Sequence, residues 1–312
     1  MAPGKIYLNN DLRGWSQNIF WELKQLGAFA QIVNNTDEIL DAEGAAMFMG
    51  LHHNAERLEK DIALAWRVHH CYPRVTMTPT LFECKLYNNK AGQCKTFPKY
   101  FPPTKCLSDK KSALSFIDNL SYPVIVKRND KAGGAGVKII HSKIEAVQET
   151  EAAFADDSAG MIIWQQYQPG NDGDYRVIVL ANEYFWIAKR FAGNNDIVDG
   201  DSVMRHGVKH YRVMDTTTIK LLDYAYRFSL QNNITRVAVD LIYDRKRNPI
   251  MTEFTTSWGT NIMNGGFWFR RGIDGGYRPT KYHGPDQYEL IANLLYDGAF
   301  QSIACKQIEA RQ

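Results

Sequence analysis

Short apolar runs and helix-spaced apolar positions alternate through the N-terminal part of the chain. Three apolar runs are predicted to be strands: 5–9, 30–34 and 45–51. Between the first two, Trp15, Ile19 and Leu23 recur at helical spacing and predict a helix over 11–27. A charged amphipathic segment at 55–68 predicts a second helix. This alternation predicts a small α/β unit over a parallel sheet.

The pattern is lost between Cys71 and Cys106, where five prolines interrupt any sustained period. We expect a connecting region there, without regular elements of its own. The sequence shows no internal repeat and no low-complexity tract. The connector therefore separates the α/β unit from whatever follows.

The remainder of the chain predicts lobes of α+β type with antiparallel ribbons. The expected strands are 122–128, 137–141, 161–168, 174–180, 183–190, 237–244 and 249–255. The expected helices are 110–120, 144–154, 217–231 and 286–303. Ala181 and Asn182 are expected to close a hairpin, and the glycine-rich residues 259–276 to lead into the last helix. The whole chain is therefore expected to have three parts, which span residues 1–106, 107–163 and 164–312.

Composition narrows the class of protein only a little. The 37 basic and 34 acidic residues give a net charge of +3, so neither nucleic acid nor a membrane surface is expected as a partner. Charges interrupt the apolar stretches before the roughly 18 residues that a membrane span needs. No signal-peptide pattern opens the chain, and five cysteines form no CxxC pair. These features predict a soluble cytoplasmic protein with free thiols.

A cluster of histidines offers a zinc site as an alternative. His52, His53, His69, His70 and Cys71 are the candidate ligands. Adjacent histidines point apart on a strand and are splayed on a helix, so this spacing favours surface or core histidines over a zinc site.

Residues 122–140, YPVIVKRNDKAGGAGVKII, place Lys127 at the end of an apolar strand and follow it with Gly133, Gly134 and Gly136. A Walker loop would need the lysine after the glycines, and a dinucleotide fingerprint would lead into a helix. A flexible hairpin flap remains, whose backbone N–H groups approach a polyphosphate while Lys127 reaches it from the strand. A hairpin with a solvent loop is the equally supported alternative from this segment alone.

Two carboxylates on later strands supply a second signal. Asp240 in VAVDLIYD and Glu253 in PIMTEFT lie on strands joined by a short polar turn, so antiparallel pairing would bring them to one face. Two such acids repel unless a cation lies between them, and hard oxygen ligands beside phosphates suit Mg²⁺. The alternative is that both are ordinary hairpin charges. Arg190, at the end of another hairpin, is a candidate phosphate contact, whereas Lys189 is expected in solvent.

The order of these motifs resembles that of the ATP-grasp superfamily, and is similar to ribosomal-protein glutamate ligases, glutathione synthetases and D-alanine:D-alanine ligases. The matching segments are NNK with PPT, PVIVKRNDKAGGAGVKII, IIWQQYQPGNDGDYRVIV, IAKR, and AVDLIYD with MTEFT. The resemblance implies an α/β N-terminal domain followed by an α+β ATP-grasp fold, in which two lobes clamp ATP.

The resemblance also implies roles for the cationic and flexible residues at the nucleotide. Lys90 matches the first nucleotide lysine and Lys127 the second. Gly133 to Gly136, including Gly134, match the flap over the phosphates. Arg190 matches the arginine that contacts phosphate and the acyl-phosphate intermediate.

The hinge strand is implied to read the rest of the nucleotide. Gln165, Gln166 and Tyr167 match the segment whose backbone recognises adenine, and Asp174 matches the acid that meets the ribose. The family usually carries Glu where Gln166 stands. Adenine is read largely through main-chain groups, so this departure is tolerable.

Asp240 and Glu253 match the family's Mg²⁺ carboxylates, for one or two ions, with Mn²⁺ as an alternative ion. Thr255 stands where the family usually has the Asn of Glu-x-Asn. A hydroxyl binds Mg²⁺ less readily than an amide oxygen. This departure puts a second ion, and full activity, in question.

The implied function is an ATP-dependent ligase that joins a carboxylate to an amine through an acyl phosphate. Arg190, Lys127 and Arg205 are the expected catalytic residues, and the substrates would be amino acids, peptides or proteins. His206, Arg270 and Arg271 are further candidates for holding a substrate carboxylate, with a solvated loop as an equal alternative for Arg270 and Arg271. Relatives often form homo-oligomers. A kinase with the same fold and a nucleotide-binding protein with impaired catalysis are the alternatives.

Overall fold

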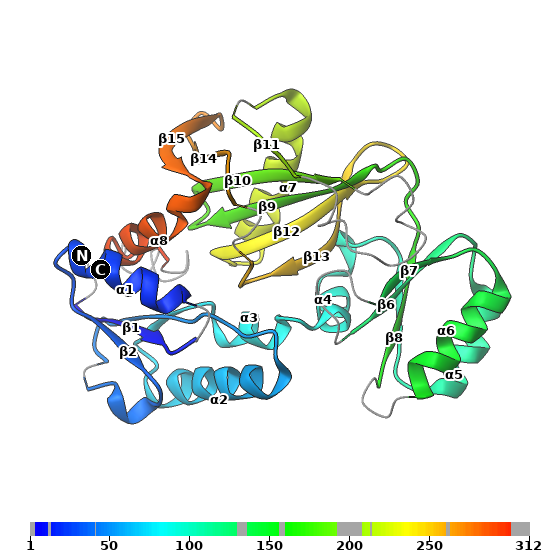
Figure 1. The fold of residues 1–312 in the computed structure, drawn as a ribbon, viewed down its shortest axis with the longest axis horizontal. Coiled ribbons are helices and arrows are strands. Elements are labelled where there is room, and N and C mark those ends of the chain that lie inside the picture. Colours follow the sequence, from blue (N-terminus) through cyan, green and yellow to red (C-terminus); the bar gives the residue numbers. More distant parts are fainter. Residues whose placement is uncertain are drawn as a thin grey trace.

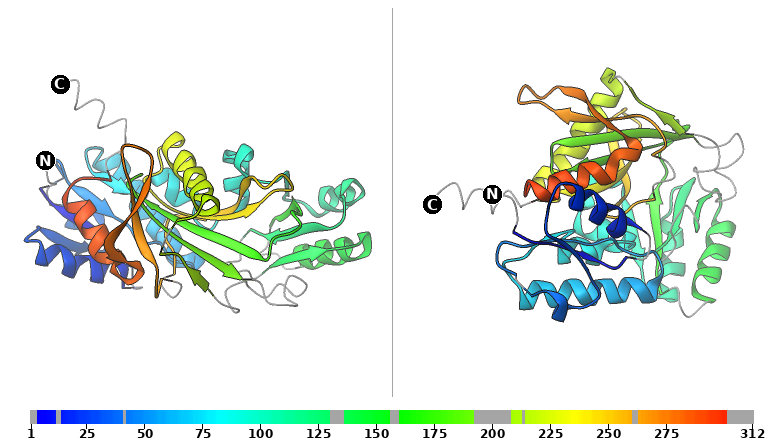
Figure 2. Two further views of the ribbon diagram at one scale, coloured as in Figure 1. Left: turned by 90° about the horizontal axis from the view of Figure 1, so that it is seen from above. Right: turned by 60° about the vertical axis from the view of Figure 1, so that its left-hand side comes forward.

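The computed structural model describes residues 4–11, 14–40, 42–129, 136–155, 160–191, 208–212, 214–259 and 263–300. Its strands form three sheets. Figure 1 shows an N-terminal unit below the central sheet and a small lobe to one side, and Figure 2 gives two further views.

The N-terminal unit is a parallel four-stranded sheet in the order β2-β1-β3-β4. Its strands are β1 (Ile6–Asn9), β2 (Ala30–Val33), β3 (Ala46–Phe48) and β4 (Thr76–Thr78). Its long helices are α1 (Trp15–Gln25) and α2 (Ala55–Cys71). The predicted α/β unit with a parallel sheet is confirmed.

Alternating side chains of this sheet pack against different helices, as the two-residue period of a strand requires. Ile6 and Leu8 share a core with α1 and with α8 (Gln287–Tyr296), the last helix described. Tyr7 and Met47 face the other way and pack on Ala65 and Val68 of α2. The C-terminal helix is therefore part of the N-terminal unit's core, beside α1 in Figure 2.

The expectation of an irregular connector at 71–106 is wrong. That segment holds β4, α3 (Leu81–Leu86), α4 (Lys90–Thr96) and β5 (Thr104–Leu107). Each element is too short for its period to show in the sequence, and prolines lie between them. Thr80 supplies a capping box with Glu83, which starts α3 directly after β4.

The small lobe is an antiparallel sheet in the order β5-β8-β6-β7. Its later strands are β6 (Val124–Arg128), β7 (Val137–Ile140) and β8 (Ile162–Gln166). Two helices, α5 (Lys110–Phe116) and α6 (Lys143–Ala155), share one core with the sheet. The boundaries predicted at 106 and 163 each fall inside a strand, β5 and β8, so both strands belong whole to this lobe.

The central lobe is an antiparallel sheet in the order β13-β12-β9-β10-β14-β15, with β11 paired to β10. Its strands are β9 (Gly173–Leu180), β10 (Tyr184–Phe191), β11 (Val208–His210), β12 (Arg236–Tyr243), β13 (Pro249–Thr255), β14 (Phe267–Arg271) and β15 (Tyr277–His283). Helix α7 (Thr216–Gln231) packs on one face. The predicted hairpin is present, with positive φ at Ala181 and Asn182.

Two C-terminal expectations need correction. The glycine-rich stretch 259–276, for which no regular element was expected, contains β14, and β15 begins directly after it. The last helix ends at Tyr296 and is followed by Gly298 at φ 67°, a backbone conformation that ends helices. Residues 301–303 of the predicted helix lie outside the described residues.

The described residues were searched for membrane-spanning helices and for metal-binding clusters. No helix among them is long and apolar enough to cross a membrane. His52 precedes α2 and His70 lies near its other end, and no group of three metal-binding side chains is found in the described ranges.

The outer edge of the central sheet is covered by one side chain from α4. Strand β13 is the edge strand, and the backbone N–H and C=O of Phe254 both face outward. Gln93 Nε2 donates to the Phe254 carbonyl at 2.8 Å, and Gln93 Oε1 accepts from the Phe254 N–H at 3.1 Å. The same amide donates to Leu86 O at 3.0 Å. A fully buried glutamine thus continues the ladder and fixes α4 to β13.

Substituting Gln93→Leu keeps the volume but leaves buried backbone groups of β13 unpaired. We expect the free energy of unfolding to fall by about 2 kcal/mol, measured by urea unfolding. The matched control is Gln148→Leu on the exposed face of α6. Equal stability of the two variants would show that the glutamine does not hold the edge.

Candidate functional site

Strand register brings five charged residues to one face of the central sheet. Asp240 lies directly opposite Glu253 on β13 and opposite Arg176 on β9. Arg190 on β10 lies opposite Asp174, which shares the face of Arg176 because the two are two residues apart. Directly paired residues of antiparallel strands project to the same side. The prediction that Asp240 and Glu253 meet on one face is confirmed by the register.

Gly173 allows these strands to pack closely at the start of β9. Its φ is 144°, and a Cβ atom there would lie 1.9 Å from the backbone oxygen of Arg190. A side chain would therefore push β10 and its arginine away from the charged face.

Asp240 is held by two guanidinium groups. Arg176 donates through Nε to Oδ1 and through Nη2 to Oδ2, both at 2.8 Å, and Arg190 Nη2 lies 3.0 Å from Oδ2. Burial alone would raise the pKa of the Asp240 carboxyl, but the two arginines outweigh burial and hold that pKa below its ordinary value. Arg190 also makes a two-bond contact with Asp174. Asp240 is therefore a carboxylate at neutral pH.

Two lysines from other parts of the chain join this face. Lys127, on β6 of the small lobe, is buried and donates to the backbone oxygen of Thr252 at 2.9 Å. Burial lowers the pKa of its ammonium group more than the nearby Glu253 raises it. Lys90, at the start of α4, places Nζ 3.6 Å from Glu253 Oε1. Basic side chains from β6, from α4 and from the central sheet thus lie around strand β13.

Residues of the small lobe and α4 are linked at the same point. The Asn129 side chain, just after β6, accepts a hydrogen bond from the backbone N–H of Ala91 at 2.9 Å. This contact positions the strand that carries Lys127 beside the helix that begins with Lys90. The two lysines lie close enough that their charges influence each other.

The donor set at Asp240 and Glu253 fits one hard divalent cation. Glu253 keeps about a third of its side chain exposed, at 32 %, so its carboxylate is open to a ligand. Asp240 would share its oxygens between an ion and the two arginines. Thr255 Oγ1 is engaged locally, since it donates to Ser257 O at 2.6 Å. Carboxylate oxygens are the ligands that Mg²⁺ prefers, and the Thr255 contact favours one ion over two.

The residues expected to read adenine and ribose lie at the junction of the small and central lobes. Gln165 and Gln166 end β8, where the Gln166 N–H already donates to Pro103 O at 2.9 Å. Tyr167 follows the strand. Asp174 lies beside Arg190 and Asp240, so a ribose contact would require it to exchange this partner. The adenine and ribose roles stay predictions.

Gly133, Gly134, Arg205 and His206 lie outside the described residues, whereas Gly136 is described, at φ 74°. The alternative of a solvated loop is wrong for Arg270 and Arg271, which lie on β14; their role toward a substrate stays a prediction.

Arg270 lies opposite Tyr184, six residues along β10 from Arg190, which is about 20 Å in a strand. It forms an ion pair with Glu183. Arg271 lies 4.2 Å from the ring centre of Tyr226. Both arginines therefore support the far end of the central sheet and do not join the charged face.

The sequence reasoning gave Arg176 no role. Its signal was available: in DYRV the acid and the arginine are two residues apart on a strand, which places both on one face. A partner for Arg176 could be named only after β9 was known to lie beside β12.

Substituting Asp240→Asn removes the charge that neutralises two buried guanidinium groups. We expect a loss of about 3 kcal/mol in the free energy of unfolding at pH 7, measured by urea unfolding. The control is Asp118→Asn in an exposed pair with Lys143.

The same substitution has a predicted pH dependence. The folded-state pKa of Asp240 lies below its ordinary value of 3.8, so its contribution to stability is complete above that pH and is lost as the pH falls further. The gap between wild type and variant should narrow below pH about 4. A gap that widens on acidification would contradict the assignment.

Comparison with known proteins agrees with this geometry. The family model described as "Prokaryotic glutathione synthetase, ATP-grasp domain" matches residues 90–221. Among solved structures, D-cycloserine synthetase DcsG is similar with a TM-score of 0.65 at 13% identity, covering 95% of this chain and 100% of the other.

Two further structures show the same fold. A RiPP-associated ATP-grasp ligase from Chryseobacterium gregarium, in complex with ADP and a leader and core peptide, has a TM-score of 0.62 at 10% identity, covering 95% and 97% of the two chains. A RimK domain protein ATP-grasp from Sphaerobacter thermophilus has a TM-score of 0.58 at 16% identity, covering 80% and 90%. Residues 90–221 thus match an ATP-grasp domain model, and the chain as a whole has the fold of these ATP-grasp structures.

Proposed function

We propose that this chain is an ATP-dependent ligase that forms an amide bond between a carboxylate and an amine through an acyl phosphate. The observation that carries the proposal is the convergence of Lys90, Lys127 and Arg190 on the face that bears Asp240 and Glu253. Three cations and two carboxylates beside one another suit a triphosphate with its divalent ion.

The chain's own residues would act mainly by offsetting charge. In the first step a substrate carboxylate approaches the γ-phosphate of ATP, and both groups are anionic. Lys90, Lys127 and Arg190 lower the repulsion and hold the groups in line. Asp240 and Glu253 would hold Mg²⁺, which supplies further charge neutralisation when it is bound.

The buried state of the lysines supports this role. Burial disfavours the charged form of Lys127 and lowers its pKa, so an incoming phosphate would stabilise the ammonium form. Arg190 is paired with Asp174 in a fixed orientation, which presents a planar guanidinium to an oxyanion.

The carboxylate substrate is proposed to be an amino acid, a peptide or a protein. The structural neighbours include a ligase solved with a leader and core peptide and D-alanine–D-alanine ligases. Phosphoryl transfer to a hydroxyl by the same fold is the alternative reaction class, and the products of the two reactions differ.

A screen of amino acids and dipeptides in pairs, with Mg-ATP, separates these functions. Release of ADP and inorganic phosphate that needs both partners, with an amide product by mass spectrometry, supports ligation. A stable phosphorylated product supports a kinase. Tight Mg-ATP binding without any ADP release would favour a protein that binds nucleotide without turnover.

Substituting Lys127→Ala should weaken ATP binding by about 10-fold to 100-fold, because a charge-assisted contact to phosphate is lost. Isothermal titration calorimetry with a non-hydrolysable ATP analogue and Mg²⁺ measures this. Lys143→Ala, an exposed lysine on α6, is the control and should bind normally. Unchanged affinity of Lys127→Ala would remove this lysine from the phosphate site.

Substituting Glu253→Ala should lower turnover by at least about 100-fold, since a site that stabilises the transition state loses its ion. The fold should persist, because Glu253 is partly exposed. Circular dichroism and urea unfolding check the fold, and Glu56→Ala on the exposed face of α2 serves as the matched control. Wild-type turnover in Glu253→Ala would refute the metal assignment.

A further inference from the structure

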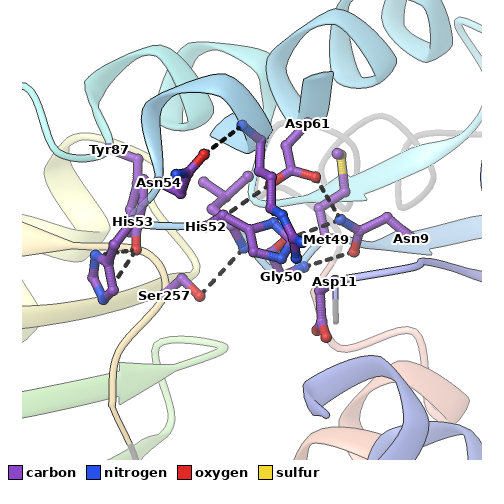
Figure 3. Close-up of polar contacts among 12 residues, drawn as sticks. Asn9, Asp11, Met49, Gly50, His52, His53, Asn54, Asp61, Tyr87 and Ser257 are labelled. Atoms are coloured by element: carbon purple, nitrogen blue, oxygen red, sulfur yellow. Dashed lines mark hydrogen bonds and ion pairs between the residues drawn. The ribbon is translucent and has the colours of Figure 1, made fainter. Parts of the chain in front are cut away.

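A buried histidine at the carboxyl ends of the strands of the N-terminal sheet has no part in the nucleotide site. His52 follows β3, and the strand order of the sheet reverses between β1 and β3. In open parallel sheets, ligands bind at the carboxyl ends of the strands at such a reversal. His52 is 6 % exposed and lies at the centre of Figure 3.

A chain of hydrogen bonds fixes the groups next to His52. The Gly50 N–H donates to Asn9 Oδ1 at 2.8 Å, and Asn9 Nδ2 donates to Gly50 O at 2.9 Å. A backbone N–H can only donate, so the orientation of the Asn9 amide is settled. Its Nδ2 also donates to Asp61 Oδ1 at 3.1 Å, as Figure 3 shows. Asp61 is therefore an acceptor on that side.

The second oxygen of Asp61 orients the imidazole. Asp61 Oδ2 accepts from the backbone N–H of His52 at 3.1 Å and lies 2.9 Å from His52 Nδ1. An ionised carboxylate accepts only, so Nδ1 carries a hydrogen, and in the neutral imidazole Nε2 then carries the lone pair.

The Nε2 atom of His52 is left without a partner among the described residues. Nε2 has no hydrogen-bond partner in the part of the chain that the structure describes, although it is buried. An unpaired buried acceptor costs about 1–3 kcal/mol. The side chain keeps 8 % of its surface exposed, so the ring is not fully enclosed. A buried acceptor that is left unpaired at this cost indicates a ligand that donates a hydrogen bond to His52 Nε2.

This edge of the sheet is joined to the metal-site strand. Ser257 Oγ, after the end of β13, accepts from the Leu51 N–H at 3.3 Å. Ser257 is four residues from Glu253, which is at most about 14 Å along an extended chain. The histidine therefore lies beside the segment that leaves the proposed phosphate site.

We infer that His52 is the base for the amine substrate, and this inference rests on the proposed ligase function. Among the reactants, the carboxylate and the phosphates only accept hydrogen bonds, whereas the amine donates. An α-amino group has an ordinary pKa of about 7.7–8.0 and is mostly an ammonium ion at pH 7. It must lose a proton before it can attack.

The proton inventory of the step is complete. His52 Nε2 takes one proton from the ammonium group, and the imidazolium is stabilised by the Asp61 carboxylate. The freed amine lone pair forms the bond to the acyl carbon. The carbon–oxygen bond to phosphate breaks, and phosphate leaves with that electron pair and with the second amine proton, as hydrogen phosphate. Asp61 and Asn9 are positioning residues.

The tautomer can be tested without any turnover. ¹⁵N NMR of the full chain with labelled histidine, assigned with His52→Gln, should show hydrogen on Nδ1 of His52 in the wild type. Hydrogen on Nε2 in the wild type would overturn the proposal.

The class of ligand is tested on the same samples. Methylammonium chloride should shift the His52 Nε2 resonance, whereas tetramethylammonium chloride, which has no N–H, should not. Equal responses to the two salts, or none to methylammonium, would overturn the proposal. These measurements decide about His52 even when the substrate screen finds no ligation, so the two hypotheses fail separately.

Kinetics of the pair found by the screen give the catalytic test. His52→Gln should lower amide formation about 100-fold and leave hydroxamate formation from hydroxylamine unchanged, because hydroxylamine is already unprotonated at neutral pH. The control is His141→Gln, an exposed histidine of the small lobe. Equal losses with both nucleophiles would show a structural role and refute the base.

Discussion

Two carboxylates placed side by side on a buried sheet face repel each other unless cations accompany them, and this constraint organises the central lobe. Asp240 meets it through Arg176 on the adjacent strand β9 and Arg190 on the next strand β10, which both reach its oxygens. The two arginines neutralise the buried carboxylate of Asp240 without nucleotide, and one of them, Arg190, is also the proposed phosphate contact. The electrostatic balance of the resting site and the proposed catalytic site are therefore built from the same side chains.

The other lobes are attached around this balance. Gln93 closes the edge of β13 and fixes α4, which begins with Lys90. Lys127 crosses from the small lobe to the backbone of β13. The strand that carries Glu253 is thus contacted by the small lobe and by α4, and the loop after it touches the N-terminal unit at Leu51. A single edge strand is the meeting point of all three parts of the fold.

The sequence predicted much of this from local patterns. Asp240 and Glu253 could be paired because a four-residue turn links their strands, and Lys127 stood out before its glycines. The partners of Arg176 and Gln93 could not be named, since they lie 64 and 161 residues away and depend on which elements become neighbours. The short elements in 71–106 were missed because three-residue strands show no period. His52 was considered as a possible metal ligand. Its contact with Asp61 could not be predicted, because it depends on how helix α2 packs beside the end of strand β3.

The most direct test of the account is a structure with Mg²⁺ and a non-hydrolysable ATP analogue. The account predicts a triphosphate among Lys90, Lys127 and Arg190, with an ion on Glu253 and Asp240 and a changed contact between Asp240 and Arg176. A nucleotide bound elsewhere, or an ion bound without either carboxylate, would contradict it.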